Sequence, residues 1–442
     1  MNIEDIRGII SENAIETVIV AGTDPTGVLR GKRFSAESFL RSATHGMHLA
    51  SFILYTTTVD DPVPWLFETG IPDCTGVPDL STFRVAPWEE GAAICLADWY
   101  QDGKPSPYCP RSELKRQVAR AREHGWAERF AMEVEFFLID QDIRVFRKGD
   151  WSMPTLASHD IHCYSVYEGH FWEPLVKELR DCFPDEIESC LPEWGPGQFE
   201  INLRHSDALS MADTTVLFKT AVKQLAAMKG FSATFMAKLH EAQSGNSGHI
   251  HQSLRDAKTG ESLFHDPASS DGMTDLFRHY LAGQIDVFRP GTMFLAPFVN
   301  SYKRFQLDSF AGVKRTWGYN NRTVSLRAIA DDPGSARLEH RVGGADLNPY
   351  TAFAYLLGAG IRGVENKMDP GEPHGGNAYN ADVEAVPTTL REALEAAEAA
   401  PAIKEILNPD MVDNLIRLAK FECGVFDQTV TELERRRYFE MT

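Results

Sequence analysis

The sequence has few cysteines, fewer basic than acidic residues, and no long apolar run. Its 442 residues include seven scattered cysteines without a C-x-x-C pair, so neither a disulfide framework nor a thiolate metal site is indicated. Lys and Arg number 44 against 63 Asp and Glu, a formal net charge of −19, which argues against a nucleic-acid or anionic-membrane partner. No segment approaches membrane-spanning length, and the N-terminus has no signal-peptide pattern. We therefore expect a cytoplasmic protein with reduced thiols.

What the sequence does contain divides into two parts. In residues 1–106, strand patterns occur over 16–21, 28–34 and 92–99, a helix pattern over 36–44, and an irregular loop over 60–80. Residues 107–442 begin with a helix over 110–123, which Pro110 opens, and residues 141–192 read as loop-rich. Further helices are predicted over 211–229, 273–288, 349–364, 389–399 and 411–437. We place a domain boundary between residues 106 and 107.

The segment 130–140, F-A-M-E-V-E-F-F-L-I-D, is the most informative stretch. In a strand, Glu133 and Glu135 point to one face, while Met132 and Val134 point into a core. Two neighbouring carboxylates repel each other and lose hydration unless cations lie between them, and hard divalent ions prefer oxygen ligands. The alternative is a half-exposed strand whose polar face meets water.

Four further segments repeat this alternation of polar and apolar residues. Their polar residues are Gln198, Glu200 and Asn202; His249, His251 and Ser253; Thr323, Ser325 and Arg327; and Arg337, Glu339 and Arg341. Five such strands indicate a curved antiparallel sheet with a polar hollow, and a solvated face would not explain all five together. Carboxylates, imidazoles and guanidinium groups in one hollow suit triphosphate chemistry with metal ions. The sequence has neither a P-loop nor a kinase-type glycine loop.

With these motifs the chain resembles the glutamine synthetase superfamily over essentially its whole length. The matching segments also include P-D-L-S-T-F-R-V-A-P-W (78–88), E-W-G-P-G-Q-F-E (193–200), N-S-Y-K-R (300–304), N-R-T-V-S-L-R (321–327), N-P-Y (348–350) and V-T-E-L-E-R-R-R-Y-F-E (430–440). The resemblance implies an α+β fold, with a small N-terminal β-grasp domain and a large catalytic domain on a curved antiparallel β-sheet flanked by helices. It also implies a homo-oligomer of stacked rings, usually a dodecamer, with active sites at subunit junctions.

The resemblance further implies that ATP activates the γ-carboxylate of glutamate as γ-glutamyl phosphate, which a nitrogen nucleophile then attacks. Two or more Mg²⁺ or Mn²⁺ ions per site are implied. The implied ligands are Glu135, Glu193 and Glu200 for one ion, and Glu133, His249 and Glu339 for the other.

The family motifs also suggest roles for the remaining polar residues. The residues implied for ATP are His251, Ser253, Arg327 and Arg337. Those implied for glutamate are Gly245, through its backbone, with Arg304, Arg341 and Glu135. Those implied for catalysis are Arg304, Arg322 and Glu339, where Arg322 would stabilise the transferred phosphoryl group. For each arginine the alternative is a surface salt bridge.

Two departures from the family pattern favour an organic amine over ammonia. Ammonia-using members carry a loop glutamate that closes the site and helps to bind and deprotonate ammonium; in the stretch 304–311 that position is Phe310. A phenyl ring cannot accept a proton but can pack against a carbon substituent, so Phe310 is assigned to an amine pocket. The family's N-terminal D-G-S-S motif, which supplies a second carboxylate from a neighbouring subunit, is missing. Asp60 and Asp61 are candidates to replace it.

We therefore expect a ligase of the γ-glutamylamide branch, which joins glutamate to a primary amine with ATP and Mg²⁺. Phe305 and Trp317, near Phe310 in sequence, favour an alkyl- or arylamine and a role in amine catabolism. One alternative is a glutamine synthetase that uses ammonia. Another is an inactive structural or regulatory ring, but such a protein should have lost metal ligands, and all six implied ligands are present.

Overall fold

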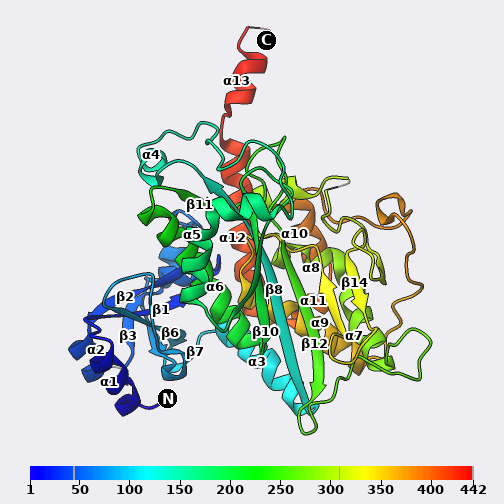
Figure 1. Cartoon of the computed structure of the whole chain (residues 1–442), viewed down its shortest axis with the longest axis horizontal. Helices are drawn as coiled ribbons and strands as arrows, with labels where there is room; N and C mark the ends of the chain where they lie inside the picture. Colours follow the sequence, from blue (N-terminus) through cyan, green and yellow to red (C-terminus); the bar gives the residue numbers. More distant parts are fainter. Residues whose placement is uncertain (43–44, 308, 441–442) are drawn as a thin grey trace.

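The computed structural model describes residues 1–42, 45–307 and 309–440. Its first sheet has mixed strand directions. The strands are β1 (Thr17–Thr23), β2 (Leu29–Ser35), β3 (Met47–Ala50), β4 (Asp73–Pro78), β5 (Arg84–Val85), β6 (Ala92–Gln101) and β7 (Lys104–Pro105). Their order is β2-β1-β6-β4-β3, with β5 and β7 also on β6, and β1 and β6 run parallel at the centre. The helices α1 (Ile3–Glu12) and α2 (Ala36–Ser42) share a core with this sheet (Figure 1).

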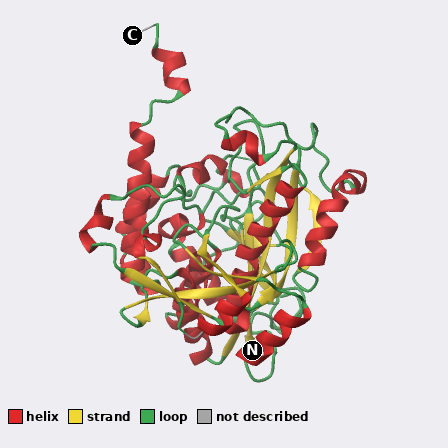
Figure 2. Cartoon of the chain, turned by 90° about the vertical axis from the view of Figure 1, so that its left-hand side faces the viewer, coloured by secondary structure: helices red, strands yellow, loops and turns green. Residues whose placement is uncertain are grey.

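The second sheet is longer and strongly curved. Its strands are β8 (Trp126–Ile139), β9 (Ile187–Pro192), β10 (Gln198–Ser206), β11 (Ser232–Thr234), β12 (Gly248–Asp256), β13 (Trp317–Tyr319), β14 (Leu326–Ile329) and β15 (Arg337–His340). The order is β13-β14-β15-β12-β8-β10-β9, with β11 on β8. Neighbouring strands are antiparallel except β13 and β14, which are parallel. Figure 2 shows the strands of this sheet beside the helical layer.

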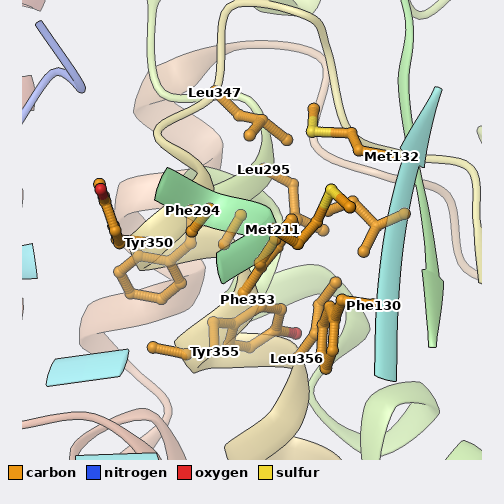
Figure 3. Packing of buried hydrophobic residues seen from close by; sticks show 14 of the residues in the cluster. Phe130, Met132, Met211, Phe294, Leu295, Leu347, Tyr350, Phe353, Tyr355 and Leu356 are labelled. Carbon is orange, nitrogen blue, oxygen red and sulfur yellow. The ribbon is translucent and has the colours of Figure 1, made fainter. Parts of the chain in front are cut away.

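Helices cover the apolar side of the second sheet. The helices of this part of the chain are α3 (Pro110–Glu123), α4 (Ile143–Arg147), α5 (Val166–Cys182), α6 (Ala208–Met228), α7 (Asp275–Asp286), α8 (Phe288–Leu295), α9 (Pro349–Glu365), α10 (Leu390–Glu398), α11 (Pro401–Ile406), α12 (Pro409–Gln428) and α13 (Glu432–Tyr438), with a 3₁₀ turn η4 (Val299–Arg304) before β13. Helix α13 extends away from the body of the molecule and does not cover the sheet (Figure 1). The apolar face of β8 packs on α6 and α9 through Phe130, Met132, Met211 and Phe353 (Figure 3). Burying large side chains on one face of β8 leaves its acidic face free for the hollow.

Close helix packing depends on glycines at one crossing. A Cβ built on Gly283 of α7 would lie 2.1 Å from the carbonyl oxygen of Ala359 in α9, and Gly363 of α9 meets α7 equally closely. Only glycine fits where two helix backbones approach this far. This contact holds α9 under the second sheet. The described residues include no helix that is both long and apolar enough to cross a membrane.

The predicted α+β class, with a small first sheet and a curved second sheet, is confirmed, but several elements differ. The segment 60–80, predicted as an irregular loop, contains a 3₁₀ helix over 64–69 and strand β4. The strand forms because its backbone pairs with β6, which comes later in the sequence. The loop-rich stretch 141–192 contains α5, which Ser165 caps. The helix predicted over 411–437 is two helices, α12 and α13, and Thr431 starts the second with a capping box.

Two further predicted elements have different bounds in the described residues. The strand predicted around Thr323 and Ser325 begins only at Leu326, because Thr323 instead makes a local turn, with its backbone and hydroxyl both bonded to Asn321. The helix predicted over 36–44 ends at Ser42 in α2, and residues 43 and 44 lie outside the described part. The boundary between residues 106 and 107 falls between β7 and α3 and stays a prediction.

Candidate active site

The second sheet places the predicted polar residues on one face because the strand register aligns them. The Cα register pairs Glu200 with Glu135, His249 with Glu133, and Glu339 with both His251 and Arg327. These residues come from β8, β10, β12, β14 and β15, and side chains that share a face across neighbouring strands lie close together. The polar hollow predicted from the alternating pattern is therefore present.

This hollow contains two adjoining cavities. The larger, about 820 Å³, is lined by the predicted residues Glu133, Glu135, Glu193, Glu200, Gly245, His249, Phe310, Arg322, Arg327, Glu339 and Arg341. The smaller, about 340 Å³, is lined by the predicted ATP residues His251, Ser253 and Arg337. Glu133 lines both cavities. Three of the four residues predicted for ATP therefore line a different cavity from Glu135, Gly245 and Arg341, whereas the fourth, Arg327, lines the larger cavity with them.

Two groups of side chains could each hold a cation. The first contains Glu133, Glu200 and His249, and the second contains Glu133, His251 and Glu339; within each group the ligand atoms lie within 4.8 Å of one another. The grouping implied by the family resemblance is different. It places Glu135 and Glu200 on one ion, and it places Glu133 on the other ion without His251. Glu135 and Glu193 line the same cavity, but neither belongs to these two groups among the described residues.

Three carboxylates in the hollow have shifted pKa values. Burial, reinforced by the nearby charge of Glu133, raises the pKa of Glu200 to about 9, and burial raises the pKa of Glu135 to about 7. For Glu133, burial opposes ionisation, but hydrogen bonds with His249 and His251 outweigh it and lower its pKa. The Nδ1 atom of His249 lies 2.9 Å from Glu133, whereas its buried Nε2 has no hydrogen-bond partner among the described residues. Carboxylates beside an unused imidazole nitrogen fit a divalent cation.

Gln198 and Ser247 hold Glu135 in place through hydrogen bonds. The amide nitrogen of Gln198 donates to Glu135 at 3.1 Å, to the carbonyl oxygen of Gly245 at 2.9 Å and to Asn246 at 2.9 Å. The backbone N–H of Ser247 donates to the same carboxylate at 2.6 Å. Gln198 therefore joins β8, β10 and the glycine-containing loop before β12. Its position on the polar face of β10 was visible in the sequence, but this role was not.

Arginines surround Glu339 at the centre of the hollow. Arg327 donates to one of its oxygens at 2.9 Å and Arg341 donates to the other. Burial opposes ionisation of Glu339, but the adjacent guanidinium of Arg341 outweighs it and lowers the pKa of Glu339 to about 2. Arg337 donates to Nδ1 of His251 at 3.2 Å, and Arg322 is exposed at the cavity. Several positive charges are thus available to an anionic substrate.

Gly245 lines the larger cavity and Arg304 lies behind it. A Cβ on Gly245 would meet Cγ of Arg304 at 2.3 Å, so a larger residue would displace the arginine. The guanidinium of Arg304 donates to the carbonyl oxygens of Val342 and Gly343 at 2.6 and 2.5 Å. Arg304 is buried and is not among the residues that line the cavity. Arg304 therefore supports the wall of the cavity from behind.

The other end of the larger cavity is aromatic. The ring of Phe310 lies 5.9 Å from that of Trp194 in an edge-on contact, and Ile161, Tyr164 and Leu307 line the same cavity with exposed apolar surface. Trp194 directly follows Glu193 in the sequence, which could have indicated it. Ile161 and Tyr164 come from the stretch that was read as loop, and no local pattern pointed to them.

Phe310 is also connected to the glutamate end of the cavity. Its backbone has a φ of +57°, which is unusual for a bulky residue, and its carbonyl oxygen accepts a hydrogen bond from Arg341 at 3.2 Å. The candidate bases lie elsewhere in this chain. Asp60 forms an ion pair with Arg30 at 2.7 Å, and Asp61 accepts from a threonine hydroxyl of its own loop; neither lines the larger cavity.

The curved sheet thus carries a hollow in which carboxylates that could hold cations lie beside arginines that could bind an anion. The sequence model of the family described as "Glutamine synthetase, catalytic domain" matches residues 107–438. The chain is 37% identical to the gamma-glutamylethanolamide synthetase GlnA4 of Streptomyces coelicolor, with 100% of this chain and 96% of that protein covered. It is 33% identical to the glutamate–isopropylamine ligase of a Pseudomonas species, with coverages of 99% and 97%.

A solved structure agrees with these sequence comparisons. The structure entitled "Apo GmaS without ligand" superposes with a TM-score of 0.86, at 29% identity and 99% coverage of both chains. The protein belongs to the glutamine synthetase family, and the predicted resemblance to its γ-glutamylamide branch is confirmed. Family membership implies ATP and divalent metal use, in agreement with the two groups of potential ligands.

Proposed function

We propose that this protein is an ATP-dependent ligase that joins the γ-carboxylate of glutamate to an organic primary amine. The observation that carries this proposal is the aromatic pair Phe310 and Trp194, which lies in the same cavity as the acidic cluster. At the position where the family's ammonia-using members need a carboxylate, this cavity offers apolar surface. The names of the two relatives, which refer to an ethanolamide product and an isopropylamine substrate, support the same reaction class.

In the proposed reaction, the γ-carboxylate oxygen of glutamate attacks the terminal phosphorus of ATP and ADP leaves. The nitrogen of the amine then attacks the resulting acyl phosphate, inorganic phosphate leaves, and the nitrogen loses a proton. Two or more Mg²⁺ or Mn²⁺ ions, held by the six implied ligands together with His251, would supply positive charge to the phosphate oxygens. Arg322 and Arg327 would stabilise the negative charge on the transferred group, and Arg341 would bind a carboxylate of glutamate.

The acidic ligands also have a role before the reaction begins. The raised pKa values of Glu135 and Glu200 indicate that burial makes these carboxylates costly to ionise. The charge of bound cations would favour their ionised forms and fix their orientation. Glu133, which lines both cavities, is placed to act between glutamate and the phosphates.

For the amine, we propose an alkyl- or arylamine. Phe310, Trp194 and Tyr164 offer ring faces and edges to a carbon substituent, and aromatic rings also attract an ammonium group. A polyamine would need several carboxylates around the acceptor nitrogen atoms, whereas Phe310, Trp194 and Tyr164 offer apolar surface. The preference for an alkyl- or arylamine rests on these side chains and not on the assignment to the family.

We further propose a cytoplasmic homo-oligomer, with a dodecamer of stacked rings expected from the family. Because Asp60 and Asp61 do not reach the cavity of their own chain, we propose that one of them serves as a base in the site of a neighbouring copy. The division into domains at residues 106 and 107 is part of the same proposal.

Phosphate release tests the proposed function. The purified protein would be incubated with ATP, Mg²⁺ and glutamate, and with ammonium, ethylamine, isopropylamine, aniline or putrescine as the acceptor. We expect turnover with alkyl- or arylamines to exceed turnover with ammonium, and the γ-glutamylamide would be identified by mass spectrometry. Robust turnover with ammonium alone would favour a glutamine synthetase, and no turnover with any acceptor would favour an inactive ring.

A further inference from the structure

Asn202 lies on the polar face of β10 and has no part in the reaction proposed above. It comes two residues after Glu200, so both side chains point to the same face of the strand. In the register of the second sheet, Asn202 lies opposite Glu133 of β8 on one side and Ser189 of β9 on the other. Strands β8 and β10 are neighbours in this sheet (Figure 1). Asn202 therefore lies beside two carboxylates that could hold a cation.

The carboxylate of Glu200 depends on Asn202 for its orientation. The amide nitrogen of Asn202 donates to Oε1 of Glu200 at 2.7 Å, and among the described residues this is the only hydrogen bond that Glu200 accepts. Other carboxylates of the hollow are held by charged or ionisable groups. Glu133 contacts two imidazoles, and Glu339 accepts from two guanidinium groups. Glu200 is therefore a potential cation ligand whose orientation rests on one neutral side chain.

A second hydrogen bond fixes the amide of Asn202 itself. The hydroxyl of Ser189 donates to Oδ1 of Asn202 at 2.7 Å. An ionised carboxylate only accepts hydrogen bonds, so the amide nitrogen must face Glu200 and the amide oxygen must face the hydroxyl. Ser189, Asn202 and Glu200 thus form a row across β9 and β10 in which each side chain orients the next. Ser189 itself is exposed and lines neither active-site cavity.

Asn202 also connects the two cavities. It lines the smaller cavity with the predicted ATP residues, whereas Glu200 lines the larger one. We propose that Asn202 is a positioning residue, which orients Glu200 for the cation that Glu200, Glu133 and His249 would hold. This role rests on the proposed function, because the proposed reaction is what requires the cation.

The size of the expected effect follows from what a partner behind a metal ligand does. A carboxylate that is already turned toward the ion loses less freedom when the ion binds, and removal of such a partner typically weakens metal binding by roughly 10- to 100-fold. Leucine branches at the same carbon as asparagine but can neither donate nor accept a hydrogen bond. Asn202→Leu therefore removes the bonds to Glu200 and Ser189 together.

Titration of Mn²⁺ into the metal-free full-length protein, without ATP, glutamate or amine, tests this role. The electron paramagnetic resonance signal of free Mn²⁺ measures how much is bound. We expect the wild type to bind two or more ions, and Asn202→Leu to bind one of them roughly 10- to 100-fold more weakly. Asn366→Leu is the matched control, because this amide also donates a single bond, to the carbonyl oxygen of Arg362 at 2.8 Å, and lines neither cavity. It should bind Mn²⁺ like the wild type.

Substitutions of Ser189 test the row without a change at the ligand. Ser189→Ala removes the bond to Asn202, so it should weaken the same ion by a smaller factor than Asn202→Leu does. Ser189→Thr keeps the hydroxyl and should bind Mn²⁺ like the wild type.

Melting curves separate positioning from folding. An ion that binds the folded protein raises its Tm, and we expect this rise to be smaller in Asn202→Leu than in the wild type, whatever the Tm of the metal-free variant. A purely structural role would lower the Tm without metal and leave the rise unchanged.

The positioning role is refuted if Asn202→Leu binds every Mn²⁺ ion as tightly as the wild type. Wild-type binding by Ser189→Ala would refute the row that begins at Ser189. Because these titrations need no turnover, they can fail while phosphate release by the wild type with amines upholds the proposed function.

Discussion

Replacing Gln198 by leucine would test how the site positions glutamate. The side chain is 1% exposed and its amide joins Glu135, Gly245 and Asn246 by three donated hydrogen bonds, while its oxygen accepts from the N–H of Gly195 at 2.8 Å. Leucine has similar volume but can form none of these bonds. A buried polar group that loses its partner costs about 1–3 kcal/mol, and a charged group is at the upper end of that range.

This range sets the expected loss of activity. If one such interaction is missing in the transition state, kcat/KM for glutamate falls by about 10- to 100-fold, because each 1.36 kcal/mol corresponds to a factor of about ten. Most of the loss should appear in the KM for glutamate, since Gly245 and Glu135 are on the glutamate side. The KM for ATP should change little. Steady-state phosphate release at several glutamate and ATP concentrations would measure both constants.

Gln284→Leu is the matched control for this experiment. Gln284 is fully buried and its amide also donates to two partners, Gln252 at 2.7 Å and the carbonyl oxygen of Leu356 at 3.0 Å, but it does not line either active-site cavity. We expect this variant to lose stability in urea unfolding while its KM for glutamate stays near the wild-type value. If the two variants change that KM equally, or if Gln198→Leu leaves it unchanged, the positioning role of Gln198 is wrong.

Four further outcomes are expected. Phe310→Glu should raise the ratio of kcat/KM for ammonium to that for isopropylamine roughly tenfold; an unchanged ratio would remove Phe310 from the amine pocket. Glu339→Gln should reduce ATP-dependent phosphate release to background and should lower the melting temperature, because the buried carboxylate pairs with Arg327 and Arg341; retained turnover would contradict the metal assignment. Arg111→Met should lower the free energy of unfolding in urea by about 3–5 kcal/mol, because this buried arginine pairs with three aspartates. Arg144→Met, an exposed control, should lower it by less than about 0.5 kcal/mol. For Asp79, burial opposes ionisation, but interactions with Ser81, Arg111 and Lys115 outweigh it and lower the pKa of this carboxyl group. The stability that Asp79 contributes is therefore present above its unfolded pKa of about 3.9 and is lost as the pH falls further. Asp79→Asn should flatten the fall in the free energy of unfolding from pH 6 to pH 3, and an unaltered slope would contradict this.

The polar strand faces could be predicted because alternation is a local property of the chain. Glu133 and Glu135 share a face in any strand that contains both, whatever the strand pairs with. The same reasoning applies to His249 and His251 in β12, where the structure confirms the strand. The pattern therefore indicated which residues face the hollow without reference to the rest of the fold.

The grouping of possible ligands could not be predicted in the same way. Which carboxylate meets which imidazole depends on the register between strands, and alternation within one strand does not determine that register. In the structure, His249 and His251 lie at 2.9 and 3.0 Å from the two oxygens of Glu133. Glu133 consequently belongs to both candidate groups, a result that no single segment of the sequence contains.

Residues from irregular segments were the hardest to predict. Tyr164 and Ile161 reach the cavity only because the segment before α5 is held against β9, where the N–H of Tyr164 donates to the carbonyl oxygen of Pro192. Such a contact joins residues that are distant in sequence and has no periodic pattern. Strand β4 was missed for the same reason, since pairing with β6 stabilises a segment rich in residues that otherwise favour turns.

Glu133 connects these observations to the binding of metal ions in the hollow. It is held ionised by two imidazoles, whereas Glu135 and Glu200 have raised pKa values. Glu133 and Glu339 are therefore the carboxylates whose ionised forms the hollow stabilises, and Glu133 lies where the two cavities meet. A cation bound there would favour ionisation of the neighbouring carboxylates by its charge. Binding of one ion should thus strengthen binding of the next, because it would favour the ionised forms of Glu135 and Glu200, whose pKa values burial raises.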